Sequence, residues 1–170
     1  MIVPPKRRGP VAGRRRALFA TVIPAVTAAV LGNAFVGRES QRWFRELNQP
    51  KLAIPMPAFV AVAGVYYAQL GVVRYRAVAR NDVHAARLAL VVLALNELWN
   101  VAFFGSRSTR NGFFGMLCFA VPVIALQRAV STDRVATVAL APYTIWVVAY
   151  DLPWSFQLWR LNPDARNQIS

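Results

Sequence analysis

Long apolar runs alternate with short polar connections along the whole chain. Five runs can be drawn, at residues 17–37, 55–73, 83–104, 112–130 and 135–158. As a helix, each can cross a hydrocarbon core of about 30 Å, which takes about 20 residues. The pattern therefore predicts an all-α integral membrane protein, a bundle of five transmembrane helices. Its membrane domain covers 17–160, between a basic N-terminal tail (1–16) and a short C-terminal tail (161–170).

The basic residues set the predicted orientation. The segment KRRGPVAGRRR at 6–16 precedes an apolar run in the manner of a secretory signal. We favour a membrane span instead, because that run is about 20 residues long rather than the 7–15 of a signal core. Twelve Lys and Arg residues fall on the N-terminal side of the predicted bundle and eight on the other side. This asymmetry predicts a cytoplasmic N-terminus.

Composition supports a membrane protein and excludes several kinds of site. The chain is 56% hydrophobic and carries a net charge of +13. A nucleic-acid partner would need a basic face on a water-soluble core, and here the Arg residues punctuate apolar runs. Cys118 and His84 are the only residues of their types, so no internal disulfide forms and no His/Cys metal site is predicted. Phosphate-loop, dinucleotide and nucleophile-elbow motifs are absent as well, so no cofactor is predicted to be required.

The third run carries polar residues where lipid would favour apolar ones. Asn96, Trp99, Asn100 and Phe103 are spaced i, i+3, i+4 and i+7, which places them on one helical face. Glu97 is rotated about 100° from Asn96 and lies at the edge of that face. An aromatic wall with a few amides suits a flat ligand. Alternatively, the amides bond neighbouring helices, where such contacts contribute about 0.6 kcal/mol on average.

The last run repeats the pattern. A second aromatic stripe is predicted at i, i+3, i+7 and i+11, consisting of Tyr143, Trp146, Tyr150 and Trp154. Asp151 adjoins the stripe, and Pro153 removes a backbone bond and is expected to bend the helix. A carboxylate costs about 2.5–3.5 kcal/mol in the middle of a span. Glu97 and Asp151 are therefore the candidate catalytic groups, as proton donors or acceptors, if the protein is an enzyme.

The polar loop 37–57 connects the first two runs and ends in three prolines. Its Trp43 and Phe44 are expected to dip into the membrane interface. The alternative is that the loop folds back over one end of the bundle, so that these two side chains close a pocket.

Together these segments resemble the TspO/MBR family, the tryptophan-rich sensory proteins related to the translocator protein. The family pattern A-L-N-x-x-W-x-x-x-F-F-G is matched in ALNELWNVAFFG at 94–105. Further matches are P-Y-x-x-W at 142–146 and W-R-L-N at 159–162. The resemblance extends from about residue 17 to 162.

The resemblance implies a five-helix bundle, commonly a homodimer, with a pocket under the first loop that binds porphyrins, sterols or benzodiazepine-type ligands. In the family the third-span Asn and the fifth-span Trp line the pocket, which carries over to Asn96 and Trp146. Two tryptophans of the family's second span are replaced here, by Pro57 and Ala63. The interval from Trp146 to Trp159 is also one residue longer than the family's usual spacing.

Three functions remain open from the sequence. The first is a membrane protein that binds a flat hydrophobic ligand, a tetrapyrrole or a sterol-like molecule, as sensor, carrier or scavenger. The second is an enzyme that promotes porphyrin breakdown, which we rank below binding because the sequence lacks a nucleophile–base pair. The third is a regulatory membrane partner without a small ligand.

Overall fold

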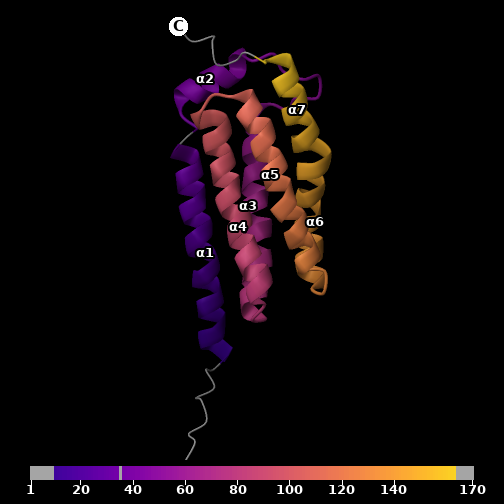
Figure 1. Cartoon of the computed structure of the whole chain (residues 1–170). Coiled ribbons are helices and arrows are strands. Elements are labelled where there is room, and N and C mark those ends of the chain that lie inside the picture. Colours follow the sequence, from indigo (N-terminus) through magenta and orange to yellow (C-terminus); the bar gives the residue numbers. More distant parts are fainter. Residues whose placement is uncertain (1–9, 35, 164–170) are drawn as a thin grey trace, which may run out of the picture.

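The chain forms a bundle of long helices in a computed structural model that describes residues 10–34 and 36–163, with residues 10–14, 32 and 33 described by their backbone alone. Figure 1 shows the helices running side by side along one axis, with one short helix lying across an end. The described residues form helices and connections and no strand. In order, the elements are α1 (Pro10–Ala34), α2 (Arg38–Glu46), α3 (Met56–Ala79), α4 (Val83–Asn100), η1 (Val101–Gly105), α5 (Thr109–Ala129), α6 (Arg134–Trp146), η2 (Val147–Asp151) and α7 (Leu152–Leu161).

Four continuous helical stretches are long and apolar enough to cross a membrane. They are Met56–Ala79, Val83–Gly105, Thr109–Ala129 and Arg134–Leu161. Large apolar side chains point outward along them, as lipid requires, since Val60, Val121, Val138 and Ile145 are each at least 64% exposed. The all-helical prediction is confirmed. The predicted number of five spans is not, because α1 is not among the four stretches found in the described residues.

The predicted tails lie mostly outside the described residues. Residues 1–9 of the basic tail are not described. The helix α1 begins at Pro10, so it includes residues that were predicted to belong to the tail. Of the C-terminal tail, residues 164–170 are not described.

Short connections join neighbouring antiparallel helices, and three of these connections end in an N-cap residue. Asp82, Ser108 and Asp133 each precede a helix and accept a hydrogen bond from a backbone N–H of its first turn. Such caps satisfy donors that a helix N-terminus leaves free. After α3, Asn81 adopts a left-handed conformation (φ 59°), which asparagine tolerates better than most residues at this position.

Packing places α3, α4, α5 and α6 around a common core. Its largest fully buried side chains include Tyr66, Phe119, Leu126 and Leu140. On the outside, α1 packs against α3 and α4. The buried Arg74 connects these three helices, because its guanidinium donates to the carbonyls of Ala20 on α1 (2.7 Å) and Ala86 on α4 (2.6 Å).

Two helices contain a π-helical turn at the same end of the bundle. The turn η1 continues α4, and η2 joins α6 to α7. A π-turn closes its hydrogen bond over five residues instead of four, so it holds one additional residue. The turn η2 lies between Trp146 and Trp159, and Pro153 follows directly after it, in the first turn of α7.

The first loop does not lie in the membrane interface, so the favoured expectation for Trp43 and Phe44 is wrong. Both belong to α2, which crosses the end of the bundle in Figure 1, and both are buried in protein. They pack on Phe103 of η1, with ring centroids 5.3 and 6.0 Å away. The alternative expectation holds for Phe44, which lines a cavity beneath α2, whereas Trp43 is buried without lining it. Burial of two large aromatic rings stabilises more than their exposure at the interface.

Candidate functional site

A cavity of about 180 Å³ lies beneath α2, and it measures about 950 Å³ when the open space at its mouth is counted. The smaller value is near that of a cavity that holds benzene, and the larger one falls within the range of pockets for drug-sized ligands. A larger ligand would therefore be enclosed only in part. The residues that line the cavity come from α3, α4, η1, α6, η2, α7 and the α1–α2 region: Val36, Phe44, Met56, Phe59, Val60, Val62, Ala63, Tyr66, Tyr67, Asn96, Trp99, Asn100, Phe103, Phe104, Tyr143, Trp146, Asp151 and Trp154.

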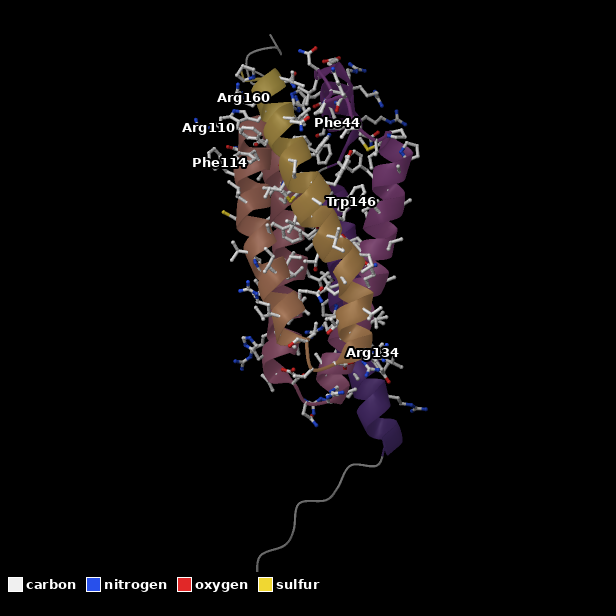
Figure 2. All side chains as sticks on the ribbon, turned by 90° about the vertical axis from the view of Figure 1, so that its right-hand side faces the viewer. Phe44, Arg110, Phe114, Arg134, Trp146 and Arg160 are labelled. Atoms are coloured by element: carbon white, nitrogen blue, oxygen red, sulfur yellow. The ribbon has the colours of Figure 1, made fainter. Side chains whose placement is uncertain are left out.

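The cavity lies between the helix formed by α6 and α7 and the first half of α3. Figure 2 shows Phe44 and Trp146 in the space between these two helices, with Phe44, a residue of α2, nearer to the covered end of the bundle. On the α3 side the cavity is lined by Val60 and Ala63, which are both exposed on the outside of the bundle. The cavity is therefore open beside α3, which is one of the four helices long and apolar enough to cross a membrane.

The residues predicted to share one face of the third run, Asn96, Trp99, Asn100 and Phe103, all line the cavity. Trp99 is fixed from two sides. Its indole N–H donates to the carbonyl of Gly112 on α5 (2.8 Å), and its ring stacks on Phe103 with centroids 5.1 Å apart and planes 15° apart. This wall is therefore held in place before a ligand binds, so its side chains lose little conformational entropy on binding.

Glu97 does not line the cavity but organises its polar wall from behind. Its carboxylate accepts hydrogen bonds from the hydroxyl of Tyr67 on α3 (2.6 Å), from the amide of Asn96 (3.1 Å) and from the amide of Asn100 (3.3 Å). Three donors offset much of the cost of a carboxylate in a span. The two Asn side chains are thereby oriented, and their carbonyl oxygens are left as acceptors for a ligand.

The second aromatic stripe is shifted by one residue after Trp146. The expected spacing assumed a regular α-helix, whereas η2 moves the following residues around the axis. Tyr143, Trp146 and Trp154 line the cavity as expected, and Asp151 lines it in place of Tyr150. The Asp151 side chain is 9% exposed, so the cavity contains a nearly buried carboxyl group.

Tyr150 instead fastens the loop that precedes α3. Its hydroxyl accepts from the backbone N–H of Ile54 (3.1 Å) and donates to the carbonyl of Leu52 (3.0 Å). A second fastening joins Asn162, after α7, to both backbone groups of Asn48, at 2.9 and 3.0 Å. Together the two fastenings hold the first loop and α2 in place over the cavity.

The helix α2 forms the cover of the cavity, an arrangement that was expected from the sequence only as the less favoured alternative. Phe44 lines the cavity and packs with Phe59 and Trp154, at centroid distances of 6.4 and 6.1 Å. A signal was present, because Ser40, Trp43 and Phe44 follow helical spacing among charged residues, and all three are buried. An amphipathic helix in a loop needs an apolar partner, and here that partner is the aromatic end of the bundle.

The cavity wall is mostly apolar and carries no basic group. None of its described lining residues is Lys, Arg or His. The indole N–H of Trp154 is buried and finds no acceptor among the described residues, so it is a spare donor. Ala63 of α3 also lines the cavity and contributes only a methyl group to this wall.

Metal-ligating and nucleophilic side chains do not gather at the cavity in the described part of the chain. This part contains no group of three or more His, Cys, Asp or Glu side chains that could hold a metal ion. Cys118 and His84 are both exposed, away from the cavity.

Comparison with known proteins agrees with the architecture. The model of the TspO/MBR family matches residues 20–159, a range that includes every residue lining the cavity. The chain is also 24% identical over 148 residues to the tryptophan-rich protein TspO of Archaeoglobus fulgidus. That alignment covers 85% of this chain and 96% of the archaeal protein.

Proposed function

Because the chain belongs to the TspO/MBR family, we propose that it binds a flat hydrophobic ligand of the tetrapyrrole class in the cavity beneath α2. Family membership and the four long apolar helices make it a multi-pass integral membrane protein. Within this proposal α1 also crosses the membrane and brings the number of spans to five, since its 25 residues correspond to about 37 Å of helix. The N-terminus is cytoplasmic in this proposal.

One observation carries the proposal: three of the five tryptophans line one cavity, and two oriented amides lie beside them. Rigid aromatic faces bind a planar conjugated ligand by stacking and by exclusion of water. A few polar groups then fix its orientation. The opening beside α3 suits a ligand that partitions into the bilayer and enters sideways.

Quenching of tryptophan fluorescence tests the proposal directly, because the tryptophans lie at the site. Purified protein in lipid nanodiscs is titrated with protoporphyrin IX, and we expect saturable quenching. Trp146→Phe and Asn96→Ala should weaken binding severalfold. The matched control is Trp159→Phe, since Trp159 stacks on Phe113 on the outside of α5 and does not line the cavity. Equal affinities in all four proteins would contradict the assignment of the site.

Catalysis on the bound ligand is a second candidate function, favoured by the buried carboxyl group of Asp151 in the cavity. A carboxyl group in an apolar site can exchange a proton with a ligand. Illuminated protein with excess porphyrin distinguishes the two functions. Bleaching that continues beyond one equivalent supports turnover, and stoichiometric binding without a product supports a receptor or carrier.

A further inference from the structure

Asp151 is the only carboxylate among the residues described as lining the cavity, and it has few partners. Of the described side chains, only that of Trp146 comes near enough to act as a hydrogen-bond donor to it. A carboxylate offers about four lone-pair positions, so most of its capacity is unused. Removing such a group from water is costly unless a charge or several donors compensate. The fold leaves this compensation to whatever occupies the cavity.

Backbone geometry directs this carboxylate into the cavity. In a regular α-helix, residues five apart such as Trp146 and Asp151 would differ by about 140° around the axis. The π-turn closes over five residues and brings the two onto nearly the same face. π-turns are rare in proteins and are frequent at functional sites. Placement of Asp151 at the site is thus built into the backbone.

The surroundings of Asp151 favour a positive charge. Aromatic rings line the same cavity, among them Trp146, Trp154 and Phe59, and the faces of such rings attract cations. The carboxylate of Glu97 lies behind the neighbouring wall and adds negative potential. No basic side chain among the described lining residues offsets these two groups. An anionic ligand group placed deep in the cavity would be repelled.

From this geometry we infer that the ligand presents a protonated nitrogen to Asp151, so that the cavity selects flat aromatic cations over neutral or anionic ligands of the same shape. The inference rests on the proposed binding function and adds the charge of the ligand to it. The carboxylate and the ammonium form a charge-assisted hydrogen bond within the cavity. The aromatic plane stacks on the tryptophans, and any carboxylate that the ligand carries stays at the mouth.

Three forms of one porphyrin test the inference. They are protoporphyrin IX, with two carboxylates, its neutral dimethyl ester, and its bis-amide with dimethylaminopropylamine, which carries two cationic amines. Each is titrated by tryptophan quenching into the unchanged protein, Asp151→Asn and Asp82→Asn. Asp82 is the matched control, since it caps α4 at the other end of the bundle, where Asn caps as well as Asp.

We expect the cationic amide to bind the unchanged protein at least tenfold more tightly than the neutral ester. Asp151→Asn should abolish this preference and change the affinity for the ester less than threefold, and Asp82→Asn should behave as the unchanged protein. The inference is overturned if the amide has no advantage over the ester, or keeps its advantage in Asp151→Asn. If that variant does not fold, the comparison of amide and ester on the unchanged protein decides. Failure of all three porphyrins to bind would instead refute the proposed function.

Discussion

Replacing Gly112 with Ala should destabilise the protein although alanine is the better helix former. A Cβ at this position on α5 would lie 2.4 Å from a ring carbon of Phe103, whereas ordinary contact begins at 3.4 Å. The ring would have to move by about 1 Å. It cannot move freely, because Phe103 is 1% exposed and touches Trp43, Phe44, Trp99, Phe104 and Trp154.

The magnitude follows from two opposing effects. Overpacking of a filled core costs about 1–3 kcal/mol. Replacement of Gly by Ala in a helix contributes about 0.5–1 kcal/mol in the other direction. The resulting loss of unfolding free energy spans about 0–2.5 kcal/mol, and a contact as close as 2.4 Å in a filled core places Gly112→Ala in the upper half of that range. Because the displaced ring of Phe103 lines the cavity, porphyrin affinity should fall as well.

The assay is reversible unfolding in detergent, followed by tryptophan fluorescence. Gly64→Ala is the matched control, since Gly64 lies within α3 and a Cβ there meets nothing within 4 Å. That control should be unchanged or more stable by up to about 1 kcal/mol. The double variant Gly112→Ala, Phe103→Leu should recover part of the loss. If Gly112→Ala is as stable as Gly64→Ala, the close contact with Phe103 does not exist in the protein.

Three further outcomes are expected. Tyr67→Phe removes the 2.6 Å hydrogen bond to Glu97 and should cost about 1 kcal/mol of unfolding free energy and weaken porphyrin binding, and unchanged values of both would contradict the role given to this network. The hydrogen bond from Arg76 lowers the pKa of Asp133, so the stability it contributes is present above about pH 4 and is lost as the pH falls through the lowered pKa. Unfolding at pH 6 and pH 3 should show a smaller loss in Asp133→Asn than in the unchanged protein, and equal losses would refute this. Tyr150→Phe frees the loop before α3, so limited proteolysis should cut that loop faster while the unfolding free energy changes by less than about 1 kcal/mol, and an unchanged cleavage rate would show that the hydroxyl does not hold the loop.

Periodicity predicted the site well wherever the helix is a regular α-helix. From Asn96 to Asn100 the backbone has 3.6 residues per turn, so spacing alone placed these side chains on one wall. After Trp146 the same spacing placed Tyr150 on the aromatic face, whereas the residue that lines the cavity is Asp151, because the π-turn η2 rotates the following residues around the helix axis. The sequence does not reveal a π-turn by its period, because the turn depends on how the flanking helices pack.

Other features depend on distant contacts and could not be read from local pattern. The need for glycine at position 112 arises from a ring on another helix. The partners of Glu97 include Tyr67, which lies 30 residues earlier in the chain. The buried cover α2 could have been predicted, since its apolar residues repeat with helical spacing, but the loop was interpreted as interfacial.

The two carboxylates near the cavity are compensated to different extents, and this explains their different roles. On the first wall, Glu97 precedes η1 within regular α-helix, and three donors satisfy it from behind the cavity. On the second wall, Asp151 ends η2 and faces the cavity with little compensation. One carboxylate therefore orients the amides that meet a ligand, and the other is left for the ligand itself. The ALNELWNVAFFG segment thus supplies aromatic rings and oriented amides to one wall, and the charge that selects the ligand comes from Asp151 on the other wall.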